Sequence, residues 1–503
     1  MIASVLAERA AAEPDAICLV DAETGERIGY RELHLDTLRV SAHLHDALGV
    51  RPGDKVATML AHSVDTYRVW LGLARVGAVE VPIGTRHRGQ MLRHVLEDSG
   101  ARLLVVDLDR LPEVAPVLAE LPSEVALVAP AALLGGPTAA PGDVGVPPGV
   151  QDVSLVLYTS GTTGPAKGVL VPWGQVHATS AGAFPAGTLG PGKVVYAPFP
   201  PHHVGGRLFG CLGILEGVPT VVRHTFSVRS FWPDVDRHGC TTVGVVSAMA
   251  SMLLGAPARP DDGAHALEEV LMVPLVPQLR EFERRFGVRV CTSFNMTEVS
   301  IPIVSEWSPD DWRSCGKVRT GPPGYELRVV DDDDVPVRTG GVGELVCRTE
   351  ASWAMNAGYL GRPEATAYAW RNGWFHTGDA FRRSEDGSYQ FVDRAKDAIR
   401  RRGENISSFE VEREVLDHPE VEACAAIGVP AELGEEEVKV FVVARRGSGL
   451  TEADVVAHVA AKAASFMVPA YVEFLDELPV TEGTGRVRKS ELRDRERRGR
   501  SAR

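Results

Sequence analysis

The sequence predicts an α/β protein whose first half forms a largely parallel sheet, followed by a β-rich segment and a compact α+β unit. In the first half, short apolar runs alternate with segments of helical periodicity, which is typical of a parallel sheet with crossover helices. Residues 321–394 carry strand-like runs joined by turns. After Arg394 helices and strands alternate over about 110 residues, a size typical of a separate domain.

Three helix–strand alternations make up the first part of the chain. The periodicity predicts helices at 30–48, 65–77 and 90–100 and strands at 55–60, 78–83 and 101–107. Residues 129–150 are rich in Ala, Pro and Gly, so we expect a surface connection there. The apolar run 153–161 then predicts a buried strand that leads into a loop rich in Gly and Thr.

The later part of the chain contains short strands and then an α+β pattern. The runs YELRVV, GELVCR and YQFVDR predict short strands joined by turns, which indicates a small β-rich subdomain. Beyond it, the pattern predicts helices at 407–419 and 451–463 and strands at 421–430 and 439–445.

Composition and charge narrow the class of protein. The 503 residues are 44% hydrophobic and 24% charged, as in an ordinary globular protein. The net charge of −14 argues against nucleic acid or an anionic membrane as a partner. The basic tail from Arg486 to Arg503 is interpreted as a solvated terminal helix with a frayed end. We expect a monomer or a homodimer that acts on a small molecule.

No feature of the sequence indicates a membrane or an oxidising compartment. No apolar run reaches the length of a membrane-spanning helix. The N-terminus lacks the basic region and apolar core of a secretion signal. The seven Cys form no C-x-x-C pair and no zinc-type cluster with His. We therefore expect a reduced, cytoplasmic protein.

The stretch LYTSGTTGPAKGV, residues 157–169, has the composition of a phosphate-binding loop. Small residues let backbone N–H groups approach a phosphate, the hydroxyls add donors, and Lys167 supplies a positive charge. The order is not that of a Walker A loop, because Gly168 and not Ser or Thr follows Lys167. Taken alone, the stretch is equally compatible with a flexible surface loop.

Four further blocks follow this loop in the chain. They are FNMTE (294–298), GWFHTGD (373–379), FVDRAKDAIRRRGENIS (391–407) and LPVTEGTGRVRK (478–489). Together the five blocks resemble the adenylate-forming superfamily of acyl-CoA synthetases, peptide-synthetase adenylation domains and luciferases. TSFNMTE and DRAKDAIRRRGENISSFEVE are most similar to the carnitine/crotonobetaine–CoA ligase branch.

The resemblance implies a fold and a domain division. We expect a large N-terminal AMP-binding domain, residues 1–395, built from two α/β subdomains and a small β-barrel. A small, mobile α+β C-terminal lid domain would follow at residues 396–503. The pivot between them is expected at Lys396, so that one site serves two half-reactions.

The resemblance also implies ATP as a substrate, Mg²⁺ as a cofactor and CoA as the co-substrate. The loop would wrap the β- and γ-phosphates of ATP through Thr159, Ser160, Gly161, Thr162, Thr163, Gly164 and Lys167. Glu298 would hold Mg²⁺, with Thr159 as a further ligand, because a hard cation prefers oxygen ligands. Thr297 would reach the α-phosphate. Outside this family context, Thr297 and Glu298 would be interpreted as a helix-capping pair.

Other residues are assigned to the ribose, the base, the acid and CoA. Asp379 and Arg394 are expected to contact the ribose, and a turn Asp and a surface Arg are the alternative interpretations. His203 in PFPPHHVGG would border the acyl pocket and act in adenylation, unless it is only a surface His beside two prolines. The remaining nucleotide or CoA contacts implied are Asn295, Met296, Phe391, Lys396, Gly403, Glu404 and Asn405.

Three departures from the family pattern bear on function. Phe294 and Asn295 stand where Tyr–Gly is usual, and Asn tolerates unusual backbone angles. The large side chains of LMVP, residues 271–274, should reduce the space beside the adenine and the acyl group. The catalytic lysine position holds Arg486, and Arg is not equivalent to Lys at a tight site.

Three hypotheses follow. The first is a ligase that adenylates a small or polar carboxylate, releases pyrophosphate and transfers the acyl group to CoA. The second resembles the ATP-dependent diazotases, which activate nitrite and couple it to an aryl amine. The third is an acyl-adenylating enzyme that feeds a carrier protein, or a degenerate binding protein with little turnover.

Overall fold

The computed structural model divides the chain into two compact units, each described here by itself. The first unit comprises 1–85, 96–157 and 168–393, and the second comprises 86–95, 158–167 and 394–503. The structure describes residues 2–135, 148–159, 166–276, 278–331, 333–394, 398–401, 404–431, 435–479, 487 and 489–501. The sequence pattern did not indicate that 86–95 and 158–167 group with the second unit.

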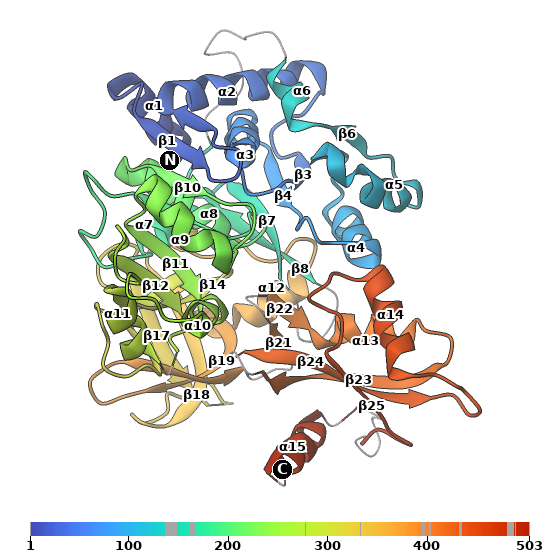
Figure 1. Ribbon diagram of the computed structural model, residues 1–503. Coiled ribbons are helices and arrows are strands. Elements are labelled where there is room, and N and C mark those ends of the chain that lie inside the picture. Colours follow the sequence, from blue (N-terminus) through green and yellow to red (C-terminus); the bar gives the residue numbers. More distant parts are fainter. Residues whose placement is uncertain are drawn as a thin grey trace. The chain divides into compact units, whose positions relative to one another are not determined.

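One sheet of the first unit has seven strands, of which β1, β10, β11 and β12 are labelled in Figure 1. Its order is β13-β12-β11-β9-β10-β1-β2, and only the β1–β2 pair is antiparallel. The strands are β1 (Ile17–Asp21), β2 (Arg27–Gly29), β9 (Val195–Ala197), β10 (Thr220–Val222), β11 (Thr242–Val246), β12 (Glu269–Val273) and β13 (Arg289–Cys291). The parallel strands end at a common edge, where ligands bind in open α/β sheets.

Alternate residues of this sheet enter two separate cores. Leu271 packs into a core shared with α3 (Val64–Val76), α8 (Val204–Glu216) and strands of the second sheet. Met272, the next residue, packs on the opposite face. Three helices cover that face: α9 (Val228–His238), α10 (Ser247–Gly255) and α11 (Leu279–Phe286). A strand buried on both faces explains the continuous apolar run that the sequence has here.

A second sheet contains the predicted strands of the first part of the chain, and its strand pairs from β6 to β7 are parallel. Its order is β6-β5-β3-β4-β7-β8. The strands are β3 (Lys55–Met59), β4 (Val79–Pro82), β5 (Leu103–Val106), β6 (Ala126–Val128), β7 (Val153–Thr159) and β8 (Lys167–Pro172). The helices of this region are α1 (Ile2–Ala12), α2 (Tyr30–Ala42), η1 (His43–Ala47), α4 (Gly89–Ser99), η2 (Leu108–Arg110), α5 (Leu111–Ala119), α6 (Pro130–Leu134) and α7 (Trp173–Ala181). The three predicted helix–strand alternations are therefore confirmed, with the first helix ending in the π-turn η1.

The β-rich subdomain is a third sheet, with the order β14-β15-β16-β20-β19-β18-β17. Its strands are β14 (Ser293–Met296), β15 (Ser300–Val304), β16 (Ser314–Val318), β17 (Tyr325–Val330), β18 (Val342–Thr349), β19 (Phe375–Arg383) and β20 (Tyr389–Arg394). Phe294 of the first strand and Tyr325 of the last pack into one core. The sheet therefore curls around that core as expected of a small barrel, although its two end strands are not paired within the described residues. The short helices η3 (Ser352–Ala354), α12 (Pro363–Ala369) and η4 (Arg371–Gly373) join its later strands.

The second unit is a three-stranded sheet with helices on both faces. β23 (Val421–Pro430) and β24 (Glu436–Ala444) are antiparallel, and β25 (Tyr471–Phe474) runs parallel to β24. α13 (Ser408–Leu416) and α14 (Glu452–Lys462) pack on one face, and α15 (Lys489–Ser501) packs on the other. A separate hairpin consists of β21 (Ala398–Arg401) and β22 (Glu404–Ser407).

The basic C-terminal tail forms a docked helix and not a wholly solvated one. Leu492 of α15 is 2% exposed and packs with Phe441 of β24. The ammonium of Lys489 lies 2.6 Å from a carboxylate oxygen of Glu412. The helix was predicted, but its docking was missed, because a single Leu in a basic run gives no clear apolar face.

None of the helices in the described part of the chain combines the length and apolar composition that a membrane crossing needs.

Candidate active site

Thr297 and Glu298 lie in the turn after β14, and the residues around this turn hydrogen-bond to their backbone carbonyls. The side-chain amide of Gln175, on α7, donates a hydrogen bond of 2.7 Å to the carbonyl of Thr297. Asn356 donates from its backbone N–H and from its side-chain amide, each across 2.9 Å, to the carbonyl of Glu298. These bonds fix the backbone from which both predicted side chains project.

The carboxylate of Glu298 is 5% exposed, and one of its oxygens accepts a hydrogen bond of 3.2 Å from the hydroxyl of Tyr359. Burial raises the pKa of Tyr359, and the negative charge of Glu298 raises it further. Tyr359 is therefore a neutral donor at physiological pH. A buried carboxylate beside phosphate oxygens is a ligand set that suits Mg²⁺, so the donor chemistry at Glu298 fits that ion.

The departure at Asn295 is absorbed without unusual backbone angles at that residue. Register shifts between Phe294 and Met296, so the strand bulges there. The positive φ lies instead at Ser300, with a φ of 57°. The turn therefore forms without using the tolerance of Asn295 for such angles. Asn295, Met296 and Thr297 are all half-buried.

Asp379 lies in β19, and a neighbouring carboxylate fastens the segment that carries it. Glu344 on β18 accepts a hydrogen bond of 2.8 Å from the N–H of Gly378 and lies 2.9 Å from Nδ1 of His376. Gly378 has a φ of 71°, which favours glycine. Thr377 accepts from the N–H of Asp379 across 3.1 Å. The Asp379 side chain is 6% exposed, so it is held in a formed environment.

His203 lies in the turn that follows β9 at the carboxyl edge of the first sheet. It is the N-cap residue of α8, with extended backbone angles. Its N–H donates to the carbonyl of Pro200 across 3.3 Å, and its carbonyl accepts from the N–H of Gly206 across 3.0 Å. Its ring is 4.2 Å from the ring of His202. The turn therefore has a defined backbone and presents two half-buried imidazoles.

The residues LMVP do not all reduce the space at this edge. Leu271 and Met272 are 5% and 0% exposed and lie in the two cores on either side of the sheet. Their size is taken up by those cores. Only Val273 and Pro274 remain accessible, so a smaller binding space there stays a prediction for these two residues. Phe391, expected at the nucleotide, is 40% exposed on β20.

The second unit contains the two ends of the predicted phosphate-binding loop. Thr159 ends β7 and Lys167 begins β8. Ala166 is held on both sides, because its N–H donates to Glu410 across 3.0 Å and its carbonyl lies 2.8 Å from Nε2 of His94. Neither contact could be predicted from the sequence, because the bonded residues lie 72 positions apart in one contact and 244 in the other.

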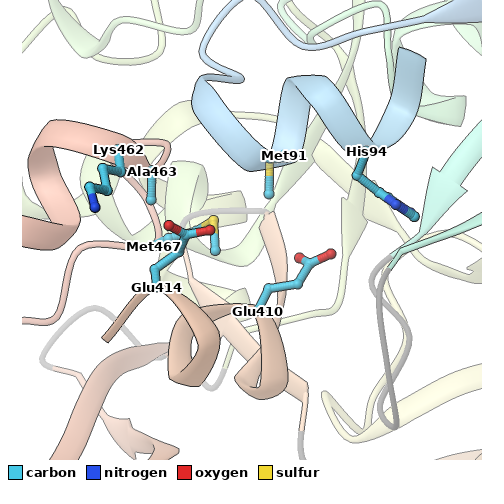
Figure 2. Close-up of a pocket in the computed structure, with 7 residues that line it drawn as sticks. All are labelled: Met91, His94, Glu410, Glu414, Lys462, Ala463 and Met467. Carbon is cyan, nitrogen blue, oxygen red and sulfur yellow. The ribbon is translucent and has the colours of Figure 1, made fainter. Parts of the chain in front are cut away.

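A pocket in the second unit is too small for any substrate. Figure 2 shows its lining residues, with His94 and Met91 on α4 and Glu410 and Glu414 on α13. It has room for about one water molecule.

Glu404 in β22 is 5% exposed and accepts a hydrogen bond of 2.8 Å from Arg86.

Several predicted residues lie outside the described residues or are described only by their backbone. Ser160, Gly161, Thr162, Thr163, Gly164, Lys396, Gly403 and Arg486 are outside the described ranges. Arg394 ends β20 and Asn405 lies in β22. The roles assigned to all of them stay predictions.

Four supporting residues were missed from the sequence: Gln175, Glu344, Asn356 and Tyr359. Asn356 and Tyr359 fall in the run NAGYLGRPE, whose Gly and Pro predict a turn before a helix. That signal predicts the turn, but it does not show which residue the turn contacts.

Comparison with known proteins identifies two family matches. Residues 6–360 match the family described as AMP-binding enzyme, and residues 410–484 match the AMP-binding enzyme C-terminal domain. The crotonobetaine/carnitine–CoA ligase of Citrobacter koseri is 30% identical over 469 residues, which covers 87% of this chain and 88% of that protein. The ligase of the same name from Salmonella paratyphi C is 31% identical over 465 residues, with the same coverage.

Solved structures share the fold along almost the whole chain. A double mutant of o-succinylbenzoate–CoA synthetase from Bacillus subtilis has a TM-score of 0.85 at 23% identity, covering 97% of this chain and 98% of its own. An amide bond synthetase from Marinactinospora thermotolerans has a TM-score of 0.83 at 24% identity, covering 98% and 99%. A fatty acyl-CoA synthetase from Mycobacterium tuberculosis has a TM-score of 0.71 at 26% identity and covers 98% of both chains. The chain thus belongs to the AMP-binding enzyme family, and it is an ATP-dependent adenylate-forming ligase that produces AMP and pyrophosphate.

Proposed function

We propose that this enzyme adenylates a small or polar carboxylic acid and transfers the acyl group to CoA. The observation that carries the proposal is the anchored Thr297–Glu298 turn, whose buried carboxylate is held by Tyr359 and whose backbone is held by Gln175 and Asn356. The similarity to crotonobetaine/carnitine–CoA ligases, which extends over 87% of the chain, supports the choice of a polar acid and of CoA.

The adenylation step follows from the groups available. An oxygen of the acid's carboxylate attacks the α-phosphorus of ATP, and the bond from that phosphorus to the bridging oxygen breaks. Pyrophosphate leaves with the electron pair of that bond. Thr297 is assigned to the α-phosphate, and Asp379 to the ribose hydroxyls. Fixed donors lower the barrier because they need not reorganise as charge develops.

Glu298 is the residue to which we assign Mg²⁺. When bound, the ion neutralises charge on the phosphates of the nucleotide. Thr159 and Lys167 are assigned to the same phosphates by the family resemblance.

Aromatic packing beside His203 supports a short acid. The rings of Phe199 and Phe209 are stacked 5.6 Å apart with an interplanar angle of 9°. A Cβ at Gly244 of β11 would lie 2.2 Å from the ring of Phe209 and 3.0 Å from that of Phe199. The two rings therefore pack against the middle of β11 at Gly244, and we infer that they limit the length of an acid bound beside His203.

The acceptor is CoA in the proposal, and other acceptors are outcomes of the test. Arg486 in the lysine position is the feature of the sequence that favours a non-standard oxyacid. Nitrite with an aryl amine, or a carrier-protein thiol, would use the same adenylation step.

Pyrophosphate release from a panel of acids, with and without CoA, tests the proposal. The panel contains crotonobetaine, carnitine, short straight-chain carboxylates and nitrite with an aryl amine. We expect pyrophosphate release with a short or polar carboxylate, and a thioester product only when CoA is present. Turnover with nitrite and amine alone, or adenylate formation that CoA does not discharge, would contradict it. The Glu298→Gln variant serves as the control for metal-dependent chemistry.

A further inference from the structure

A buried ion pair lies beneath the turn that carries His203. Arg207 on α8 is 1% exposed and Glu80 on β4 is 0% exposed. One terminal nitrogen of Arg207 donates to Oε1 of Glu80 across 2.7 Å, and Thr58 donates to the same oxygen across 2.6 Å. The pair joins a strand of one parallel sheet to a helix that packs on the other.

The remaining donors of Arg207 bind backbone. Its Nε donates to the carbonyl of Pro201 across 3.0 Å, and its second terminal nitrogen donates to the carbonyl of Thr66 across 3.4 Å. The guanidinium lies 4.9 Å from the ring centroid of Trp70. Because guanidinium is a rigid planar fork, its contact with Glu80 fixes the direction of the bond to Pro201.

A second contact holds the other side of the same turn. The hydroxyl of Tyr67 donates to the carbonyl of Gly206 across 3.0 Å and lies 3.0 Å from Nε2 of His62. A Cβ at Gly206 would lie 2.2 Å from the carbonyl oxygen of Pro200, so the backbone approaches itself closely there. His203 therefore lies in the chain between two fixed backbone carbonyls. Arg207 donates to the carbonyl of Pro201, and Tyr67 donates to that of Gly206.

Stability alone does not account for this ion pair. Burial raises the pKa of Glu80, against the opposing effects of the Arg207 charge and the Thr58 hydroxyl. Apolar residues of similar volume often replace a buried ion pair without loss of stability. Such a replacement would, however, remove the directed hydrogen bond from the guanidinium of Arg207 to the carbonyl of Pro201.

We propose that Arg207, oriented by Glu80, is a positioning residue that sets the place of the His203 imidazole for adenylation. The inference rests on the proposed function for its catalytic consequence, and on the contacts of Arg207 for the positioning itself. A displacement of a catalytic group by about 1 Å can lower the rate by about 100-fold. Loss of the contacts of Arg207 should therefore have a measurable effect on the rate of adenylation.

The first experiment measures positioning without any substrate. Hydrogen exchange is followed by mass spectrometry in peptides that cover residues 199–209. The variant is Arg207→Lys, which keeps a cation for Glu80 but loses the fork. We expect local exchange to become at least about tenfold faster, with other peptides unchanged. The matched control is Tyr196→Phe, which removes the 2.8 Å bond to Asp234 from the preceding strand without touching the turn. Unchanged exchange in Arg207→Lys, or an equal rise in the control, overturns the inference.

The second experiment is a double-mutant cycle on adenylation. ATP–pyrophosphate exchange is measured with crotonobetaine, or with the acid of the panel that releases pyrophosphate fastest. Variants are Arg207→Lys, His203→Ala and the two combined. We expect each single variant to lower kcat about 10-fold or more, to leave the KM for ATP within about 2-fold, and to be non-additive in combination. Additive losses mean that Arg207 acts elsewhere, which overturns the inference.

Two outcomes separate failure of the inference from failure of the catalytic role assigned to His203. If His203→Ala has normal kcat, the proposed role of His203 and the catalytic half of this inference both fall. If His203→Ala is impaired while Arg207→Lys is normal, only the inference falls. Should Arg207→Lys fold poorly, the paired variant Glu80→Met with Arg207→Met leaves no buried charge and takes its place.

Discussion

The hydroxyl of Tyr359 donates a hydrogen bond of 3.2 Å to the carboxylate of Glu298, across 61 positions in the sequence. Asn356, three residues before Tyr359, fixes the backbone carbonyl of the same glutamate. The loop that contains Asn356 and Tyr359 therefore holds both the backbone carbonyl and the side-chain carboxylate of Glu298 in place. That arrangement leads to the first prediction.

Replacing Glu298 with Gln keeps its size but removes the negative charge. We expect metal-dependent pyrophosphate release to fall by at least about 100-fold, because the amide is a weak ligand for Mg²⁺ and neutralises no charge. Tyr359→Phe is the matched variant, since it removes only the hydrogen bond; its loss should stay within about 10-fold. Near-normal turnover by purified Glu298→Gln would remove the metal assignment.

The aromatic stack at Phe199 predicts a change in acid range. Phe199→Ala removes one ring beside the His203 turn, and we expect kcat/KM for longer acids to rise about 10-fold relative to the shortest acid. Competition between acids of increasing chain length in the pyrophosphate assay measures this ratio. Phe282→Leu, in the core on the opposite face of the sheet, is the control and should leave the ratio unchanged. An unaltered ratio in Phe199→Ala would place the acid elsewhere.

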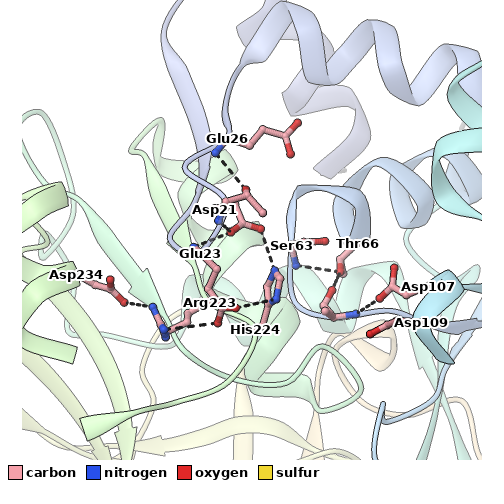
Figure 3. Close-up of polar contacts among 12 residues, drawn as sticks. Asp21, Glu23, Glu26, Ser63, Thr66, Asp107, Asp109, Arg223, His224 and Asp234 are labelled. Carbon is pink, nitrogen blue, oxygen red and sulfur yellow. Dashed lines mark hydrogen bonds and ion pairs between the residues drawn. The ribbon is translucent and has the colours of Figure 1, made fainter. Parts of the chain in front are cut away.

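A polar cluster at the same sheet edge predicts how stability depends on pH. Figure 3 shows His224 next to Asp21 and Glu23, with its ring nitrogens 3.1 Å from a carboxylate oxygen of each. The hydrogen bond to Asp21 raises the pKa of His224; burial opposes this, and the charges of Asp21, Glu23 and Asp107 add to the rise. Burial raises the pKa of Asp21, but His224 and the N–H groups of Thr24 and Glu23 lower it to about 2.

Because the folded pKa of His224 lies above its unfolded value, its contribution is fully present below about pH 6.5 and is lost as pH rises through the folded pKa. We expect His224→Gln to be less stable than the parent protein at pH 6 by about 1 kcal/mol, and the difference to shrink towards pH 8.5. Denaturant midpoints of both proteins across this range measure it. A constant difference would mean that the charge state of His224 does not change over this pH range. Asp21 has the opposite pH dependence. Its contribution to stability is present above about pH 4 and is lost as the pH falls towards 2.

The role of Arg486 stays a prediction from the sequence, and it concerns only the adenylation half-reaction. If its guanidinium binds the α-phosphate and the acid, Arg486→Ala should cost roughly 2–4 kcal/mol in adenylation, and Arg486→Lys should keep much of the activity. Product formation from chemically made adenylate should be nearly unaffected in both variants.

Separate assays of the two half-reactions decide the matter. Losses within about 2-fold in Arg486→Ala would mean that the chemistry proceeds without this residue. Lys489 is the natural comparison, because its ammonium is 2.6 Å from both Glu412 and the hydroxyl of Ser408. Lys489→Ala should weaken the docking of α15 and lower the stability of the second unit, a different signature from a rate loss.

Local elements could be predicted because their signals are local. The strands at 325–330, 389–394 and 421–430 agree with the structure in their bounds. The predicted helix at 65–77 agrees within one residue at each end, since Gly77 ends it in a left-handed conformation. The docking of the basic tail could not be predicted from the sequence. It depends on the apolar face of β23 and β24, against which Leu492 of α15 packs.

The sequence by itself determined the fold class, the family and the order of the site blocks, because periodicity and turn residues act over a few positions and the blocks are short and ordered. Only the tertiary structure decided which residues support those blocks. Arg207 meets Glu80 across 127 positions, and Glu298 meets Tyr359 across 61. A pattern of apolar and polar residues fixes which face of an element is buried, but the partner of a buried polar group depends on which elements become neighbours.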